Sequence, residues 1–228
     1  MLEQLKDRVC RANLDLVEQG LVIQTWGNVS ARDQETGLIV IKPSGINYRK
    51  MTPGDMVVVD QDGSRIEGKH KPSTDAPSHV ILYKAFPSIG GIVHTHSTYA
   101  TSWAQAGKDI PPFGTTHADH FHGVVPCTRH LSRKEIIKEY EGNTGRIIIE
   151  RMKGLDPEEV CSVLVASHGP FSWGKDPENA VNNAVVLEEI ARMAFYTILL
   201  GRTEPVDEVL LDKHYFRKHG KDAYYGQK

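Results

Sequence analysis

Residues 86–97 read FPSIGGIVHTHS, and within them 90–96 is typical of a buried β-strand. The apolar residues are continuous rather than alternating, as expected when both faces of a strand are covered. His94 and His96 lie two residues apart, so on a strand their imidazoles point to the same face and can reach one ion. This stretch therefore predicts a strand within a central sheet and a candidate metal site near its end.

Further strands are expected on either side of this segment. They are apolar, β-branched runs bounded by turn residues, at 38–41, 56–59 and 163–166. Because these runs are also continuous, both faces of each strand should be buried.

Helices are expected between the strands. An apolar stripe covers 2–19, a helical pattern follows 72–75, Ser132 and Glu135 form a capping box, and Asp176 should cap a helix that ends near Leu200. Residues 143–161 fit either a strand or a helix. Since strands and helices mix along the whole length without a linker or repeat, we expect one α/β (α+β) domain over residues 1–228.

Composition excludes several classes of protein. The chain has 228 residues, 39% hydrophobic and 25% charged, with a formal net charge of −2. This charge argues against nucleic-acid binding, which favours a basic surplus. No apolar run is long enough for a membrane span, and no signal peptide begins the chain. Three cysteines without metal-type spacing, Cys10, Cys127 and Cys161, suit a reducing compartment, so we expect a cytoplasmic protein.

Two more residues fit a metal site at the end of the 90–96 strand. His168 follows another expected buried strand, and Asp75 lies where a loop enters a helix. Three or four nitrogen and oxygen ligands suit zinc, with manganese or another divalent ion as the alternative. A rival cluster exists in His117, His120 and His122, and spacing alone does not exclude it.

Seven longer motifs make the chain resemble the class II sugar-phosphate aldolases and epimerases, and among them the L-ribulose-5-phosphate 4-epimerases. The resemblance runs nearly end to end. The motifs are TWGNVSARD (25–33), IKPSG (41–45), KPSTDAPSH (71–79), FPSIGGIVHTHS (86–97), GTTHADHFHG (114–123), SHGPFSWGK (167–175) and LLDKHYFRKHGKDAYYGQ (210–227). Thr74 departs from an expected Ser, and His120 and His122 from expected Tyr-like residues.

The resemblance implies a central, largely antiparallel sheet flanked by helices, and a homotetramer whose active sites are shared between subunits. It implies that Asp75, His94, His96 and His168 hold one divalent ion, usually zinc. It implies that Asp119 and Tyr225 are the acid/base pair. The positions implied for substrate binding, mostly to the phosphate, are Gly27, Asn28, Lys42, Ser44, Gly45, Ser73, Thr74, His214 and Arg217.

The implied reaction is conversion of L-ribulose 5-phosphate to D-xylulose 5-phosphate, within an arabinose, ascorbate or other pentose route. The C4 hydrogen is not adjacent to the C2 carbonyl, so simple deprotonation gives no stabilised carbanion. Transient oxidation by a nicotinamide would call for a G-x-G-x-x-G motif, which the chain lacks. Retro-aldol cleavage between C3 and C4 needs only an electron sink, which a divalent ion supplies.

Two alternatives follow from the same resemblance. The first is a sugar-phosphate aldolase, which releases both fragments; Asp75 favours the epimerase, because related aldolases tend to carry Glu there. The second is a non-catalytic, adducin-like interaction domain. Retention of all four implied metal ligands argues against that second alternative.

Overall fold

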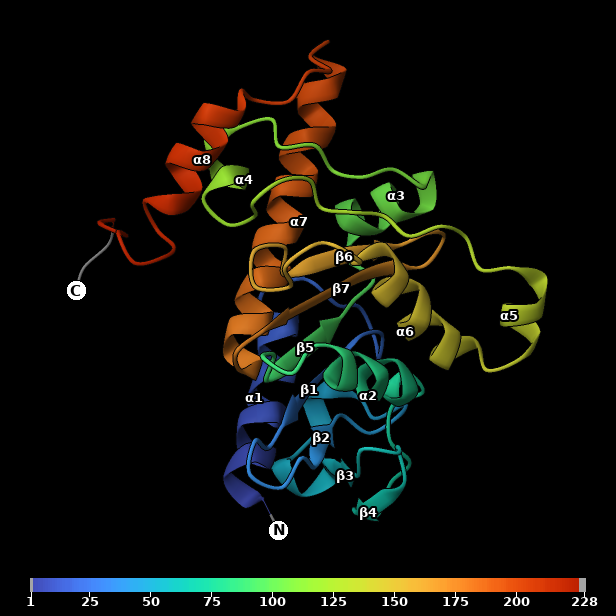
Figure 1. Ribbon diagram of the computed structural model, residues 1–228. Coiled ribbons are helices and arrows are strands. Elements are labelled where there is room, and N and C mark those ends of the chain that lie inside the picture. The colour runs from blue at the N-terminus through green and yellow to red at the C-terminus, as the bar shows by residue number, and fades with distance from the viewer. Residues whose placement is uncertain (1, 226–228) are drawn as a thin grey trace.

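The computed structural model describes residues 2–225, so residue 1 and residues 226–228, the end of the last motif, lie outside the description (Figure 1). The strands are β1 (Asn28–Arg32), β2 (Ile39–Ile41), β3 (Val57–Val59), β4 (Arg65–Glu67), β5 (Gly91–His94), β6 (Ser162–Val165) and β7 (Gly169–Gly174). The helices are α1 (Glu3–Glu18), α2 (Ala76–Ala85), α3 (Thr98–Ala106), α4 (Thr115–Ala118), α5 (Arg133–Ile137), α6 (Tyr140–Arg151), α7 (Pro177–Leu199) and α8 (Glu208–Phe216), with short 3-10 turns η1 (Tyr48–Lys50) and η2 (Pro53–Asp55).

The strands form one seven-stranded sheet in the order β4-β3-β2-β1-β5-β7-β6, and every paired neighbour is antiparallel. The stretch around residue 90 supplies the central strand β5. Its last residue, His94, pairs with Asn28 of β1 on one side and with Phe171 of β7 on the other. The register therefore brings the ends of three strands together at His94.

Helices cover both faces of the sheet, which explains why the strands are apolar without alternation. One core cluster joins α1 and α7 to Val29 and Val93, and another joins α2 to Ile41 and Ile92. Figure 1 shows α1 and α7 on one side of the sheet and α2 and α6 on the other. The expectation of a largely antiparallel sheet flanked by helices is confirmed.

The expected strands at 38–41, 56–59 and 163–166 are confirmed as β2, β3 and β6, each fully buried. The strand expected at 90–96 ends two residues early, because β5 stops at His94 and the chain leaves the sheet before α3. His96 is therefore not a strand residue, and the same-face argument for the two histidines was wrong in its premise. The ambiguous segment 143–161 contains most of helix α6, which packs against α2.

Helix α7 begins as expected, because the Asp176 side chain accepts a hydrogen bond from the Asn179 amide (2.8 Å). Its first half is buried against β5 and β7. Beyond Ala194 its apolar side chains turn outward, and Leu199 and Leu200 are 65% and 89% exposed. The buried side chains of this helix therefore continue as far as Ala194, well into its second half. Figure 1 shows α4 and α8 beside the far end of α7, beyond the sheet.

The three cysteines are free and buried. Burial raises the pKa of the Cys127 thiol to about 11 and that of Cys161 to about 12. These thiols therefore stay protonated and unreactive at neutral pH. Within residues 2–225, no helix combines the length and the apolar character that a membrane crossing requires.

Candidate metal and phosphate site

Three histidines converge where β5 ends. Donor atoms of His94, His96 and His168 all lie within 4.8 Å of one another, and they are the one such cluster among the described residues. The Nε2 atoms of His94 and His96 are 3.1 Å apart. The imidazole centroids of His94 and His168 are separated by 4.7 Å, and those of His96 and His168 by 5.1 Å. Although His96 lies past the strand, the loop still turns its ring toward His94.

The tautomer of His94 is fixed by the neighbouring strand. Its Nδ1 donates to the Pro170 carbonyl (2.9 Å), and its ring stacks on Phe171 at 4.3 Å. With the proton on Nδ1, Nε2 carries a lone pair directed at the centre of the cluster. A backbone carbonyl that holds the distal nitrogen in this way is the usual support of a metal-ligating histidine.

His168 is presented by a tight turn between β6 and β7. Ser167, just before it, has φ +62°, a conformation that costs about 1 kcal/mol or more for a residue with a side chain. The turn is anchored by a hydrogen bond from the Ser167 amide to the Ala104 carbonyl (2.9 Å). Burial and the two neighbouring histidines lower the pKa of His168 to about 3. His168 is therefore a neutral imidazole, the form that binds metal.

Asp75 lines the same cavity but lies outside the tight histidine cluster. It is the N-cap residue of α2, yet its side chain makes no capping hydrogen bond. Instead its Oδ2 accepts from Asn28 Nδ2 (2.7 Å). Burial raises the pKa of this carboxyl, but the imidazoles of His94, His79 and His168 together with the Asn28 amide outweigh burial and lower it. The carboxylate is therefore ionised and turned toward the histidines rather than toward its own helix.

A cavity of about 400 Å³ connects the histidines to the residues expected to hold a phosphate. Its lining includes all seven of them: Gly27, Asn28, Lys42, Ser44, Gly45, Ser73 and Thr74. Gly27 has φ +81°, and a Cβ there would lie 2.8 Å from the His94 carbonyl oxygen, so only glycine fits. The Asn28 amide also donates to Ser73 (3.0 Å), while its Oδ1 is buried without a partner among the described residues.

Lys42 supplies the positive charge of the cavity. Its ammonium lies over the Tyr48 ring at 4.6 Å and 3.4 Å from the Thr25 carbonyl. Burial lowers the pKa of Lys42 to about 8, although the nearby Asp75 opposes the shift. An anion bound beside it would favour the charged form and offset this burial.

Four lining residues, Thr25, Trp26, Tyr140 and Glu141, were missed by the sequence interpretation. Tyr140 and Glu141, at the start of α6, line the cavity opposite the phosphate segment, and the Tyr140 hydroxyl is 3.4 Å from His168 Nδ1. Trp26 stands beside His96, with ring centroids 6.3 Å apart. Tyr140 and Glu141 lie between the motifs that end at 123 and begin at 167, so only the packing of α6 on α2 reveals their position.

A second cluster gathers the other expected site residues at α8. Asp119 accepts hydrogen bonds from His214 Nδ1 (3.0 Å) and from Arg217 (2.9 Å to each carboxylate oxygen). Lys218, which the sequence interpretation did not single out, lies 3.2 Å from Asp119. The Tyr225 ring lies under both cations, 4.6 Å from the Arg217 guanidinium and 4.9 Å from Lys218. Asp119 and Tyr225 thus belong to the same cluster, joined through Arg217 and Lys218.

This α8 cluster does not meet the histidine cavity within one chain. None of Asp119, His214, Arg217 and Tyr225 lines that cavity. Figure 1 shows why: β5 lies in the middle of the sheet, whereas α4 and α8 lie beyond it at the far end of α7. The expected site residues are therefore divided between two places in the subunit.

The rival histidines do not form a metal site. His117 is buried and donates to the Gly123 carbonyl (2.7 Å), while His122 bonds to Glu159 and Asp212. His120 lines a different cavity, next to His219. The rival cluster is therefore excluded among the described residues, since its three rings point to three different sets of partners.

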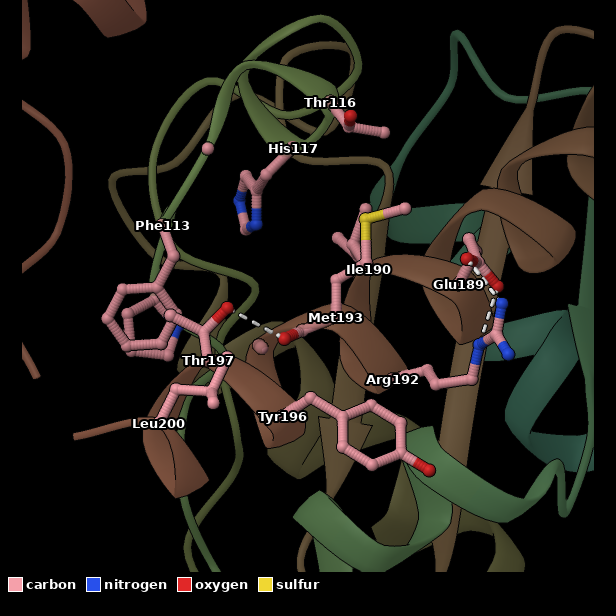
Figure 2. A pocket seen from close by; sticks show the side chains of 13 residues that line it. Phe113, Thr116, His117, Glu189, Ile190, Arg192, Met193, Tyr196, Thr197 and Leu200 are labelled. Atoms are coloured by element: carbon pink, nitrogen blue, oxygen red, sulfur yellow. Dashed lines mark hydrogen bonds and ion pairs between the residues drawn. The ribbon is translucent and has the colours of Figure 1, made fainter. Parts of the chain in front are cut away.

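Another cavity, of about 510 Å³, lies between the 111–117 segment and the second half of α7 (Figure 2). Figure 2 shows Phe113 and His117 facing Met193, Thr197 and Leu200 across it. Its polar side chains on α7 are already paired: Thr197 donates to the Met193 carbonyl, and Arg192 to Glu189. This cavity has an apolar rim and no convergent ligand set.

Comparison with known proteins agrees with the geometry of the site. Residues 7–195 match the family model described as Class II Aldolase and Adducin N-terminal domain. The chain is 55% identical over 228 residues, all of both chains, to L-ribulose-5-phosphate 4-epimerase UlaF of Salmonella paratyphi B (strain ATCC BAA-1250 / SPB7), and equally to that of Salmonella typhi. Among solved structures, an L-fuculose 1-phosphate aldolase matches with TM-score 0.80 and 27% identity, covering 92% of this chain and 94% of that one.

Proposed function

This chain belongs to the class II aldolase and adducin family, and we propose that it is a metal-dependent L-ribulose-5-phosphate 4-epimerase, an isomerase acting as one catalytic domain. The full-length curated relatives carry that name. The observation that carries the proposal is the convergence of three imidazoles beside the residues expected to hold a phosphate, all in one cavity. A sugar phosphate needs both: an ion for its ketose end and a cradle for its phosphate.

The residues present fit a divalent ion. The Nε2 atoms of His94 and His96 lie 3.1 Å apart, and the bond from His94 Nδ1 to the Pro170 carbonyl leaves His94 Nε2 facing the centre of the cluster. We assign His94, His96 and His168 as ligands and Asp75 as the fourth, with zinc as the ion and manganese as the alternative. When bound, the ion supplies a Lewis acid that stabilises the negative charge formed on the sugar when its C3–C4 bond breaks.

The chain's own groups hold the phosphate while the cleaved aldehyde turns. Lys42 supplies charge, and the amide of Asn28 and the hydroxyls of Ser44, Ser73 and Thr74 supply polar contacts. Glycine at position 27 lets this segment pack closely on the His94 carbonyl, which places the phosphate-binding residues beside the histidines. An anchored phosphate keeps glycolaldehyde phosphate in the cavity, so that its other face can be presented for bond formation.

Asp119 and Tyr225 exchange the proton of the C4 hydroxyl, one on each face of the aldehyde. Burial raises the pKa of the Asp119 carboxyl, but its three basic hydrogen-bond partners outweigh that effect and lower the pKa to about 2. Asp119 therefore enters the reaction as a carboxylate, the form that accepts a proton. Tyr225 has a phenolic hydroxyl, which can donate a proton, and it serves as the donor.

The divided site supports a homotetramer in which each active site forms between two subunits. One subunit would supply the metal and phosphate residues, and its neighbour would supply Asp119 and Tyr225 together with His214 and Arg217. The exposed apolar end of α7, including Leu199 and Leu200, supports a subunit contact at this end of the molecule. The buried, reduced cysteines suit the cytoplasm as the compartment.

The test is conversion of L-ribulose 5-phosphate followed by carbon-13 NMR, with zinc-loaded and chelator-treated protein. The expected result is metal-dependent formation of D-xylulose 5-phosphate without free fragments. His96→Asn should abolish both turnover and stoichiometric metal binding. His130→Asn is the matched control, because His130 is exposed and bonds only to Ser167, outside the triad.

Three other outcomes of this experiment would contradict parts of the proposal. Accumulation of dihydroxyacetone and glycolaldehyde phosphate would identify an aldolase of the same family. Metal binding without any change in this sugar would reject the substrate, and absence of stoichiometric metal would reject the histidine assignment itself.

A further inference from the structure

His122 lies between two carboxylates from different parts of the chain. Its Nε2 is 2.8 Å from Asp212 Oδ1, and its Nδ1 is 3.3 Å from Glu159 Oε2. The ring also stacks on Tyr215, with centroids 4.8 Å apart and an interplanar angle of 30°. Each ring nitrogen thus faces an acceptor that cannot donate in its ionised form.

Only the imidazolium form satisfies both contacts. A neutral imidazole has one N–H and one lone pair, so one of the two carboxylates would face a lone pair. Partial burial lowers the pKa of His122, but Asp212 and Glu159 outweigh it, and the pKa lies above its ordinary value. The remaining neighbours are Phe216, whose ring lies 5.1 Å away, and Tyr215, beside which Asp156 and Glu158 add negative charge.

The two carboxylates join elements that carry different parts of the molecule. Asp212 lies in α8, and Glu159 lies in the connection from α6 to β6, while His122 follows α4. The segment between α7 and α8 is joined to the rest of the subunit by a hydrogen bond from the Val206 amide to the Pro112 carbonyl (2.8 Å). Tyr215, which is buried, is held between His122 and His219 by ring stacking.

We propose that His122 is a proton-dependent clamp that docks α8 on the body of the subunit and so positions His214 and Arg217 on Asp119. His214 lies two residues after Asp212, and Arg217 is the C-cap residue of the same helix. Loss of the ion pair at Asp212 weakens the docking of the helix that carries His214 and ends at Arg217. His122 is a positioning residue in this scheme, because it acts on Asp119 only through α8.

The direction of the pH effect follows from the geometry. The protonated clamp contributes its full stabilisation to docking below the pKa that His122 has when α8 is undocked. That contribution is lost as the pH rises through the higher pKa of the docked state. Docking of α8 is therefore tighter in mildly acidic than in alkaline solution.

Hydrogen exchange of residues 208–216 tests the clamp on the intact protein. In wild type, protection corrected for intrinsic exchange should fall between about pH 6 and about pH 9, through the range where histidine loses its proton. His122→Phe keeps a ring against Tyr215 but cannot charge. It should lower protection at about pH 6 by roughly three- to tenfold, as expected for two partly exposed ion pairs, and should flatten the pH dependence.

Two further variants sharpen the test. Asp212→Asn keeps His122 and removes one carboxylate, so it should give part of the same loss. His70→Gln removes a histidine–carboxylate pair with Asp55 (3.1 Å) at the other end of the sheet and should leave α8 unchanged. Equal protection and equal pH dependence in wild type and His122→Phe would overturn the clamp.

A kinetic readout connects the clamp to catalysis, and this part rests on the proposed function. In wild type, kcat should fall as the pH rises and His122 loses its proton. This fall should occur at lower pH in Asp212→Asn, which keeps only one carboxylate beside His122. In His122→Phe, the part of the fall that is due to His122 should be absent. A purely structural substitution would lower kcat equally at every pH. If α8 exchange responds and kcat does not, the clamp is supported and the role proposed for Asp119 is the part that fails.

Discussion

His94 donates its Nδ1 proton to the Pro170 carbonyl, and this single bond decides what its other nitrogen can do. Nε2 is left as an acceptor 3.1 Å from another histidine nitrogen. That nitrogen can accept a hydrogen bond from His96 or bind a cation at the centre of the cluster. At the scale of the residue, then, the bond to Pro170 leaves one ligand atom of the site directed at its neighbours.

Tyr225 is expected to carry a proton without touching the metal. Tyr225→Phe should lower kcat by roughly 10²- to 10⁴-fold, the usual contribution of one acid/base group. Metal content, measured by mass spectrometry, should be unchanged, because Tyr225 contacts Arg217 and Lys218 rather than the histidines. Tyr224→Phe is the matched control, since Tyr224 is exposed and lies over Lys213 instead. Loss of metal, or full activity, in Tyr225→Phe would contradict the assignment.

Lys42 should give substrate binding an alkaline limit. Its pKa is lowered to about 8 by burial, and only the charged amine attracts the phosphate. Below that pH the amine is protonated and KM is low. As the pH rises through about 8, KM should increase, while a bound phosphate delays the loss by favouring the charged form. Separate KM and kcat profiles check this expectation. Lys42→Met should raise KM at all pH values and remove the step, and an unaltered step in that variant would assign it to another group.

The sequence predicted a set of site residues from side-chain identity, and the structure gathers them in two places, the histidine cavity and the α8 cluster. Neither ligand geometry nor cavity lining follows from that identity. Tyr140 reaches His168 only because α6 packs on α2, and no residue spacing records that contact. Lys218 lies beside Asp119 only once α8 has docked. Residues brought together by tertiary packing were therefore the ones missed.

Among the elements, α7 depends on its first residue. Asp176 caps the helix by accepting from the Asn179 amide, so Asp176→Ala should lower the free energy of unfolding by about 1 kcal/mol. Chemical denaturation measures this. Ser132→Ala removes the corresponding cap from the short, exposed helix α5 and should have a smaller effect, because few core contacts depend on α5. Equal losses for the two caps would show that α7 does not limit global stability.

Element boundaries were predictable where local chemistry sets them. The caps at Ser132 and Asp176 and the glycine after α7 are local signals, and each lies where it was expected. The end of β5 was misjudged by two residues, since hydrogen bonding to β1 and β7 decides it and not the apolar run itself. The type of segment 143–161 was undecided for the same reason: burial of Ile147 and Ile148 suits either a strand or a helix.

At the scale of the molecule, the divided site predicts that two inactive proteins restore activity when mixed. His96→Asn lacks the metal half, and Asp119→Asn lacks the acid/base half. After the two are unfolded and refolded together, sites that combine the intact halves should recover up to about a quarter of wild-type activity in randomly assorted rings. Each variant alone should stay inactive after the same treatment. Absence of recovery in confirmed hybrids would contradict a site shared between subunits.

The order of strands in the sheet did not follow from the sequence pattern. β5 lies between β1 and β7, so its neighbours come from distant parts of the chain. An apolar run identifies a strand but does not indicate which other strands it pairs with, and seven strands can be arranged in a sheet in many orders. The resemblance to a known family supplied the architecture that local pattern could not, namely an antiparallel sheet covered on both faces.

A subunit divided in this way folds before it can react. The histidines, the phosphate-binding residues around Gly27 and the α8 cluster each form within one chain, so under the proposed assignments a single subunit already holds the groups for the ion and for the phosphate. If sites form between subunits as proposed, that subunit has no proton donor near the bound sugar. Turnover then begins only when subunits assemble, so the rate at which activity appears should be second order in subunit concentration. Freshly diluted enzyme should regain its rate with a lag that shortens as protein concentration rises.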